Sequence, residues 1–198
     1  MTGPSAPRPL GGPVLQDSVT AAISAAFFEE LAAAGYSKLS LEAVAKRAGA
    51  GKAAIYRRWS SKLEMAIALI SDVVANTPEP PDSGTLRGDL LAFLTEAAEL
   101  LRHPLPAKII PDLLAEVGRN PELGQALLTA VRDPRRVRAT HMLERSIERG
   151  ELPADLDLTL ANDLLAGPLY WHFAIANTPA TPEYLGRLAD KLLAALKA

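Results

Sequence analysis

The chain has 198 residues, 48% of them hydrophobic, and its formal net charge is −2. This length holds one large domain or two small ones, and the near balance of charge excludes a protein that is basic over its whole surface, so any contact with nucleic acid has to be local. The lack of cysteine excludes disulfides, thiolate metal sites and a cysteine nucleophile. No apolar run approaches the roughly 20 residues that span a bilayer, and we expect a cytoplasmic protein that makes no membrane contact.

Residues 1–14 are rich in proline and glycine, and we predict a disordered leader there. Beyond it, alternating strand patterns are nearly absent, whereas alanine and leucine recur at helical spacing, which predicts an all-α fold. A cluster of helix-breaking residues at 76–84, NTPEPPDSG, divides the chain into predicted domains of residues 15–76 and 77–198. The helices expected in the first domain are Asp17–Ala34, Leu41–Ala48, Lys52–Trp59 and Lys62–Ala75. Those expected in the second are Thr85–Arg102, Ala107–Arg119, Pro121–Gly150 (with Pro134 as a candidate break), Asp157–Asn177 and Pro182–Lys197.

Basic residues concentrate in one segment, Ser40–Lys62, which reads SLEAVAKRAGAGKAAIYRRWSSK. It holds six lysine and arginine residues and a single acid, Glu42, while the rest of the chain is acidic on balance. Two short helical patterns flank a turn built on Gly49, Ala50 and Gly51. This layout is typical of a helix-turn-helix, and a basic island in an acidic protein indicates binding to nucleic acid.

The segment resembles the helix-turn-helix of the TetR family of bacterial repressors. The matching residues are the helix end Phe27–Gly35, then Ser40, Val44, Ala45, Ala48 and Gly49, then Lys52, Ile55, Tyr56, Trp59 and Lys62. A looser likeness covers residues 149–175, RGELPADLDLTLANDLLAGPLYWHFAI. The resemblance implies an N-terminal three-helix helix-turn-helix domain that binds DNA and a C-terminal helical bundle for ligand binding and dimerisation.

The resemblance also implies which residues contact a double-stranded DNA operator. Base or base-proximal contacts are implied for Lys52, Ala53 and Tyr56, and phosphate contacts for Ser40, Arg57, Arg58 and Lys62. The chain departs from the family at Gly51, where a hydroxyl residue is usual, and at Arg57 and Arg58, where aromatic residues or histidine are frequent. These departures leave the operator sequence open.

The spacing of the residues bears on the same roles. Ile55 and Trp59 lie four positions apart and should face the core. Tyr56 lies one step round the helix, at the border with DNA, where its hydroxyl reaches a phosphate or a base; the alternative is an ordinary core aromatic. For Arg57 and Arg58 the alternative is a solvated helix face.

The second domain has four consecutive aromatic-type residues, 170–173, after Pro168, which should kink their helix. They cover more than one helix face, so either they divide between a cavity and a partner chain or all serve ordinary core and dimer packing. We predict a pocket for a small, largely apolar effector. Its candidate lining is Phe93, Leu94, His103, Ile109, Leu113, Met142, Tyr170, Trp171 and Phe173. The three histidines are far apart in sequence and lack carboxylates at ligand spacing, so we expect no metal and no cofactor.

The last two long helices carry leucines at helical spacing, which predicts an interface between two copies of the chain. These are Leu160, Leu164, Leu165, Leu185, Leu188, Leu192 and Leu196. No nucleophile–base motif, phosphate loop or dinucleotide fingerprint occurs in the sequence, and we do not expect an enzyme. We expect a ligand-responsive, sequence-specific transcriptional repressor that acts as a homodimer; the alternative is a ligand- or lipid-binding helical bundle that does not bind DNA.

Overall fold

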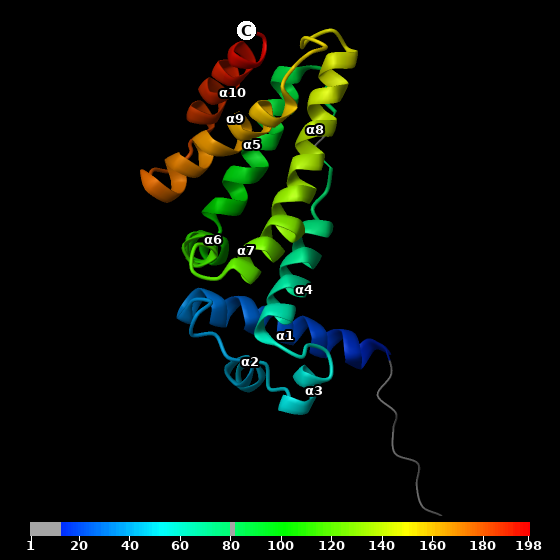
Figure 1. The fold of residues 1–198 in the computed structure, drawn as a ribbon, viewed down its shortest axis with the longest axis vertical. Coiled ribbons are helices and arrows are strands. Elements are labelled where there is room, and N and C mark those ends of the chain that lie inside the picture. Colours follow the sequence, from blue (N-terminus) through cyan, green and yellow to red (C-terminus); the bar gives the residue numbers. More distant parts are fainter. Residues whose placement is uncertain (1–12, 80–81) are drawn as a thin grey trace, which may run out of the picture. The chain divides into compact units, whose positions relative to one another are not determined.

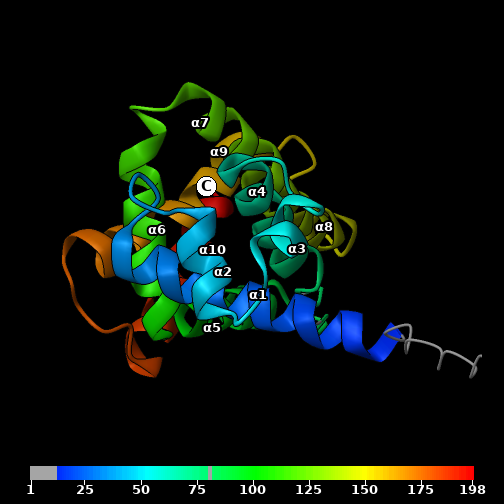
Figure 2. The same ribbon diagram turned by 90° about the horizontal axis from the view of Figure 1, so that it is seen from below.

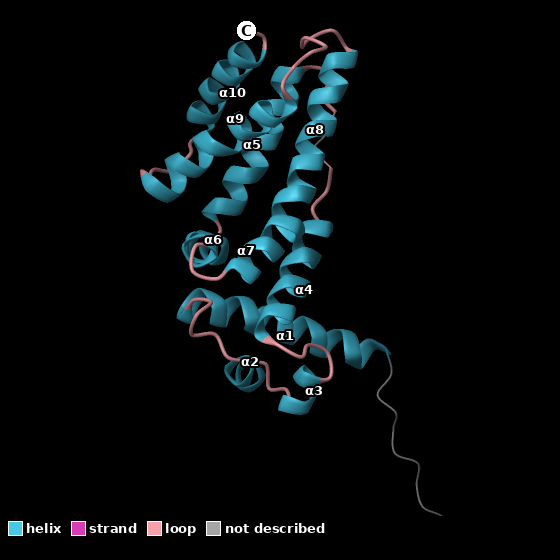
Figure 3. Ribbon diagram, in the orientation of Figure 1, coloured by secondary structure: helices cyan, strands magenta, loops and turns pink. Residues whose placement is uncertain are grey.

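The computed structural model describes residues 13–79 and 82–198. Every regular element in these ranges is a helix, and no strand occurs among them (Figure 3), so the all-α prediction is confirmed. No helix in the described part of the chain is both long and apolar enough to cross a membrane. Most of the predicted leader lies outside the described residues, but the first helix begins at Pro13. The prediction of disorder is therefore wrong for residues 13 and 14; proline is well tolerated in the first turn of a helix, where the missing N–H needs no partner.

The chain divides into two compact units, residues 1–65 and 66–198. In the first unit, α2 (Leu41–Arg47) and α3 (Lys52–Tyr56) lie on the same side of α1 (Pro13–Ala34), as Figure 1 and Figure 2 show from two directions. Helix α4 (Lys62–Ala75) begins in this unit and continues into the second. The large side chains buried in the first unit are Ile23, Phe27, Leu31, Tyr36, Leu39, Leu41, Val44, Ile55, Trp59 and Met65.

Local signals in the sequence set the ends of these helices. Gly35 and Gly49 end α1 and α2 with φ angles of 75° and 63°, in the left-handed region that glycine adopts without strain. Ser61 Oγ accepts the Glu64 N–H at 3.1 Å, and the Glu64 carboxylate accepts the Ser60 N–H at 2.6 Å, which together cap the start of α4. Gly51 precedes α3 without a side-chain cap, as expected where glycine replaces a hydroxyl residue.

The second unit is a bundle of longer helices. Its elements are α5 (Leu86–Arg102), α6 (Pro104–Val117), α7 (Pro121–Leu127), α8 (Asp133–Glu148), α9 (Leu158–Tyr170) and α10 (Pro182–Leu196), with π-helical turns η1 (Leu128–Arg132) and η2 (Trp171–Ile175). Helix α10 packs along α5, and both contribute to a core shared with α8 and α9. Leu165, Leu185, Leu192 and Leu196 lie in this core, and Leu164 and Leu188 pack against it. These six leucines are thus largely used within the chain, and only Leu160 of the predicted interface set is exposed.

The structure also differs from the sequence prediction at several helix boundaries and at the division of the chain. Residues 121–150 do not break at Pro134, which lies in the first turn of α8; the irregularity is η1, just before it. Helix α6 begins at Pro104, three residues earlier than predicted. The two units divide within α4, whereas the predicted boundary after residue 76 lies at its end.

A buried carboxylate joins the segment before α5 to the end of α8. Asp89 is fully buried and accepts the Ser83 N–H and hydroxyl, each at 2.7 Å, while Arg149 Nη2 donates to its other oxygen at 2.9 Å. Arg149 Nε also donates to Glu151 at 2.8 Å, and Glu151 accepts the Leu86 N–H at 2.9 Å. Burial raises the pKa of Asp89, but the hydrogen bonds from Ser83 and Arg149 outweigh burial and lower it overall.

Candidate nucleic-acid interface and ligand cavity

One side of α3 carries exposed side chains, and the other side faces the core of the first unit. Ile55 is fully buried and Trp59 is 8% exposed, which confirms their predicted place in the core. Tyr56 is 48% exposed, so the alternative of a core aromatic is wrong for this residue. The exposed residues of α3 and the position after it are Lys52, Ala53, Tyr56 and Arg57. A short helix that presents two cations, one small residue and one aromatic hydroxyl to solvent has the chemistry needed to enter a DNA groove.

A carboxylate from α2 lies within this exposed face. Glu42 Oε1 accepts the Tyr56 hydroxyl proton at 3.0 Å and lies 3.6 Å from Lys52 Nζ. The pKa of Glu42 is lowered, first by a hydrogen bond from its own backbone N–H and then by the one from Tyr56, and Lys52 adds to the effect. The same hydrogen bond raises the pKa of Tyr56. Glu42 is therefore ionised at neutral pH and contacts Tyr56 and Lys52, two of the three residues expected to lie nearest the bases.

Two of the residues expected to contact phosphate have roles inside the helix-turn-helix. Ser40 caps α2, where its Oγ accepts the Ala43 N–H at 3.1 Å. Arg58 is half-buried, and its Nη1 donates to the Ala54 carbonyl at 2.9 Å. The Arg58 guanidinium keeps further N–H groups for an outside acceptor.

Lys62 is also held within the first unit. Its Nζ donates to the backbone carbonyls of Tyr36 at 2.9 Å and Ser37 at 3.1 Å, and it lies 4.6 Å from the centre of the Tyr36 ring. Two of its three donors are thus used to tie the start of α4 to the turn after α1. The sequence does not reveal this role, because Lys62 and Tyr36 are brought together only by the fold.

The basic segment is partly neutralised from α1. Arg47 donates through Nε to Glu30 at 2.8 Å and through Nη1 to Glu29 at 3.3 Å. The pKa of Arg47 is raised, chiefly by the bond to Glu30. Lys46, in contrast, is exposed on α2. The positive charge that faces solvent therefore comes mainly from Lys46, Lys52 and Arg57.

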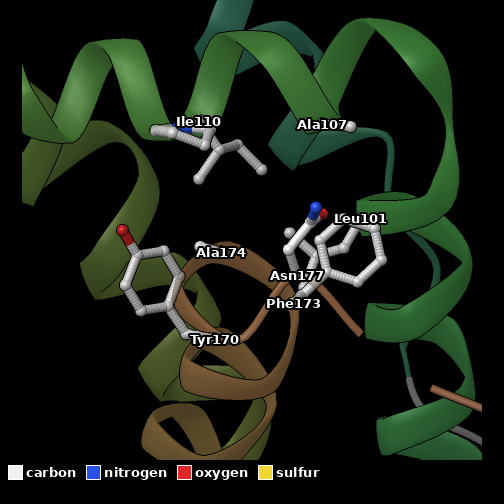
Figure 4. Close-up of a pocket in the computed structure, with 8 residues that line it drawn as sticks. Leu101, Ala107, Ile110, Tyr170, Phe173, Ala174 and Asn177 are labelled. Carbon is white, nitrogen blue, oxygen red and sulfur yellow. The ribbon is translucent and has the colours of Figure 1, made fainter. Parts of the chain in front are cut away.

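The second unit contains a partly open cavity of about 160 Å³ between α6 and the end of α9. Figure 4 shows Ala107 and Ile110 on the α6 side, with Tyr170, Phe173, Ala174 and Asn177 facing them. Leu101 of α5 and Pro111 complete the lining. Six of the eight lining residues have apolar side chains, and the Tyr170 hydroxyl and the Asn177 amide are the polar side-chain groups. Such a wall suits a small ligand that is mostly apolar and makes one or two hydrogen bonds.

Asn177 is a lining residue that the sequence analysis missed. It has a φ of 49° and follows η2, in which five residues form a widened turn. Left-handed backbone is uncommon outside glycine, and asparagine is among the residues that adopt it most readily. In the sequence, Asn177 and Thr178 begin the proline-containing run NTPATP, which indicates a turn rather than a pocket.

Of the nine predicted lining residues, the structure brings Tyr170 and Phe173 to this cavity. Leu94 and Met142 are fully buried in the core, Ile109 and Leu113 are buried on α6, and Phe93 packs against the core. Trp171 is 64% exposed, and His103 caps α6 through its Nδ1, which accepts the Leu105 N–H at 3.4 Å. The seven residues other than Tyr170 and Phe173 do not line the cavity, and their contact with a ligand stays a prediction.

The histidines do not come together in space. His172 stacks on Tyr184 with ring centres 3.8 Å apart, and His141 is exposed on α8. Within the described ranges, no group of three or more His, Asp or Glu side chains is placed to hold a metal ion.

Known proteins match both units of the chain. The family model described as "Bacterial regulatory proteins, tetR family" matches residues 23–69, and "Tetracyclin repressor-like, C-terminal domain" matches residues 80–192. An uncharacterized HTH-type transcriptional regulator of Mycobacterium bovis is 35% identical over 161 residues, covering 80% of this chain and 78% of the relative. The DNA-binding transcriptional repressor TetR of Mycobacteroides abscessus is 33% identical over 181 residues, covering 89% and 93%. The crystal structure of a TetR family transcription regulator superposes with a TM-score of 0.70 at 28% identity, covering 89% of this chain and 97% of that one.

Proposed function

Since the chain belongs to the TetR family of bacterial transcriptional regulators, we propose that it is a ligand-responsive repressor that binds a DNA operator as a homodimer. The observation that carries the proposal is the exposed face of α3, with Lys52, Tyr56 and Arg57 directed to solvent and Ile55 anchored in the core. A protein with this role works in the cytoplasm, where bacterial DNA lies. The family consists of regulators rather than enzymes.

The DNA-binding residues divide into two groups by their exposure. Lys52, Ala53, Tyr56 and Arg57 are exposed and supply direct contacts to base edges and phosphates. Ser40, Arg58 and Lys62 hold the helix-turn-helix together, and they add phosphate contacts through the donors that their internal bonds leave unused. The first group should therefore determine affinity and operator choice, and the second should determine the geometry of the domain.

The homodimer is supported by an apolar stripe along α9 and η2. Leu160, Trp171 and Ile175 are all more than half exposed, and their spacing places them on one face together with Gly167. A Cβ added at Gly167 would meet no atom within 4 Å in its own chain, so a side chain is not excluded there by the protomer itself. Large apolar side chains in a row on a surface usually mark an interface. In a two-fold dimer, this face would meet its own copy and set the distance between the two copies of α3.

The effector proposed for the cavity is a small, mostly apolar molecule. The volume of about 160 Å³ is close to that of an engineered protein cavity that binds benzene. A single substituted ring matches this space, with one polar substituent to pair with the Tyr170 hydroxyl or the Asn177 amide. Such a ligand can lower operator affinity by no more than the ratio of its own affinities for two forms of the dimer, the form that does not bind DNA and the form that does.

The decisive experiment is a selection of bound fragments from the host genome, followed by gel shifts with the selected fragment and a scrambled duplex. The wild-type protein should retain a common sequence and shift it at lower concentration than the scrambled duplex. The Lys52→Ala, Arg57→Ala double variant should lose this binding and keep its helical content, because both side chains are exposed. A wild-type protein that selects no fragment and shifts neither duplex would favour the alternative of a helical bundle that binds ligand but not DNA.

A further inference from the structure

The carboxylate of Glu42 lies where a DNA-binding surface would be expected to avoid negative charge. Its side chain is 46% exposed, and its neighbours on α3 are Tyr56, at 3.0 Å from hydroxyl to Oε1, and Lys52, at 3.6 Å from Nζ to Oε1. It belongs to α2, so its place among the α3 side chains comes from the packing of the two helices. An acid beside phosphates opposes binding, so its presence needs a compensating role.

The direction of the hydrogen bond between Glu42 and Tyr56 limits what the tyrosine offers to DNA. A tyrosine hydroxyl has one proton and two lone pairs, and a carboxylate only accepts. The Tyr56 proton is therefore used on Glu42, and the phenol oxygen can only accept from an outside group. Phosphate oxygens are acceptors too, so they cannot bond to Tyr56 in this arrangement. Adenine N6 and cytosine N4 are the amino groups that donate in the major groove.

We propose that Glu42 is a positioning residue that determines the operator specificity of this protein. It holds the Tyr56 hydroxyl as an acceptor for the amino group of an adenine or cytosine. Its charge weakens binding to DNA of every sequence, and only a sequence that supplies this amino group offsets the loss. The proposal rests on the proposed DNA-binding function. Lys52 keeps two further donors for phosphate or guanine while one of its N–H groups faces Glu42.

The charge of Glu42 and its hydrogen bond are separable by mutation. Glu42→Ala removes both, whereas Glu42→Gln removes the charge and keeps an oxygen that can accept the Tyr56 proton. Tyr56→Phe removes the acceptor and leaves the charge. Glu29→Gln is the matched control, because it removes one negative charge from α1, where Glu29 pairs with Arg47 of α2.

The experiment measures the affinity of each variant for the selected operator and for a scrambled duplex of equal length over a range of salt concentrations. Glu42→Ala should bind the scrambled duplex about fivefold tighter at low salt, as expected for the loss of one repulsive charge near phosphates. The ratio of its operator affinity to its scrambled-duplex affinity should fall about tenfold or more, which is the discrimination expected from one base contact. Glu42→Gln should also bind the scrambled duplex more tightly, but its ratio of operator to scrambled affinity should stay near the wild-type value. Glu29→Gln should change neither the scrambled-duplex affinity nor this ratio.

The link to Tyr56 is tested by combining the changes. Tyr56→Phe should lower the ratio as much as Glu42→Ala, and adding Glu42→Ala to Tyr56→Phe should lower it no further, because both remove the same contact. Unchanged discrimination in Glu42→Ala, with operator binding intact in the wild type, would overturn this proposal and leave the DNA-binding function standing. Equal weakening of both duplexes by Tyr56→Phe would also overturn it, since that result means that the hydroxyl donates to phosphate. A wild-type protein that binds no DNA would overturn the proposed function itself, and this inference with it.

Discussion

Lys62 shows what a family pattern leaves out about a single residue. The resemblance implies a phosphate contact for it, which stays a prediction, and the structure adds that its ammonium is bound to two backbone carbonyls and lies over the Tyr36 ring. The periodicity of α3 predicted correctly that Ile55 and Trp59 are buried, because that inference depends only on helix geometry. Partners distant in sequence, such as Lys62 with Tyr36, follow from tertiary packing and leave no local signal.

Lys62 and Arg57 should therefore respond differently to replacement by alanine. Lys62→Ala should lower the free energy of unfolding by about 1 kcal/mol, through the lost charged hydrogen bonds and the ring contact of a partly exposed side chain. Arg57→Ala should leave stability unchanged, weaken binding to all DNA sequences alike, and reduce the slope of log affinity against log salt by about one. Urea unfolding and salt-dependent binding measurements separate the two effects. A stable Lys62→Ala protein with a reduced salt slope would show that the carbonyl bonds contribute little.

Asp89 gives the protein a predictable response to acid. Its pKa is lower in the folded chain than in the unfolded chain, so its stabilising contribution is fully present above the unfolded value of about 3.9 and is lost as pH falls through the lower folded value. Asp89→Asn should cost about 2 kcal/mol at neutral pH, because it weakens a buried pair with Arg149. The variant should also lose less stability than the wild type on acidification to pH 3.

The control for this prediction is Asp163→Asn. Asp163 pairs with Arg136 at 3.0 Å, but its side chain is 66% exposed, so the change should stay within about 0.5 kcal/mol. Urea unfolding at a series of pH values checks both variants. Equal losses in the exposed and the buried variant at neutral pH would contradict the importance assigned to burial.

At the scale of helices, the end of α9 shows which features a sequence predicts and which it does not. Pro168 indicated an irregular helix, and a widened turn, η2, does follow it. Of the four aromatic-type residues, Tyr170 and Phe173 line the cavity, His172 stacks on Tyr184, and Trp171 is exposed, so that its contact with a partner chain stays a prediction. The rotation of the neighbouring α5, α6 and α8 could not be deduced from one sequence, and most of the predicted lining on those helices lies in the core instead.

The cavity predicts which side-chain change abolishes the response to an effector. Ala174→Leu should fill part of the space lined by Tyr170 and Phe173, and so prevent a single-ring ligand from releasing operator DNA, while DNA binding itself stays as in the wild type. Ala176→Leu is the control, because Ala176 is exposed and does not line the cavity. The measurement is release of labelled operator by a panel of small aromatic compounds.

Trp171 fluorescence can be recorded in the same ligand titrations. Because Trp171 does not line the cavity, its fluorescence should respond weakly to a ligand there, and a thermal shift of the protein is the better report of binding. The prediction would be contradicted if charged metabolites release the operator, apolar rings do not, and Ala174→Leu behaves like the wild type. That result would mean that the ligand site is not in this cavity.

At the scale of the whole molecule, the structure changes the argument for a dimer. The leucines on α10 that suggested an interface are mostly buried against α5 and α9 within the same chain. Helical spacing alone does not distinguish a core-facing stripe from an interface, since both are apolar rows on one helix face. The exposure of the side chains distinguishes the two cases. Leu160, Trp171 and Ile175 on α9 and η2 are exposed, so this row is the candidate interface.

Charges placed in this row should therefore separate the dimer without unfolding the protomer. The double variant Leu160→Glu, Trp171→Glu should have a mass near that of one chain, 21.0 kDa, whereas the wild type should have about twice that mass by light scattering. Both side chains are exposed, so the helical content and the thermal midpoint of the protomer at low concentration should change little. Leu114→Glu is the control, because Leu114 is 48% exposed on α6, outside the row.

The same variant connects association to DNA binding. Two copies of α3 that bind successive turns of the groove need a fixed separation of about 34–36 Å, which a monomer cannot provide. The double variant should therefore bind a complete operator no more tightly than a single half-site, while its salt dependence falls because fewer phosphates are contacted per complex. A double variant that remains dimeric, or a wild type that is monomeric at micromolar concentration, would show that the exposed row on α9 and η2 is not the interface.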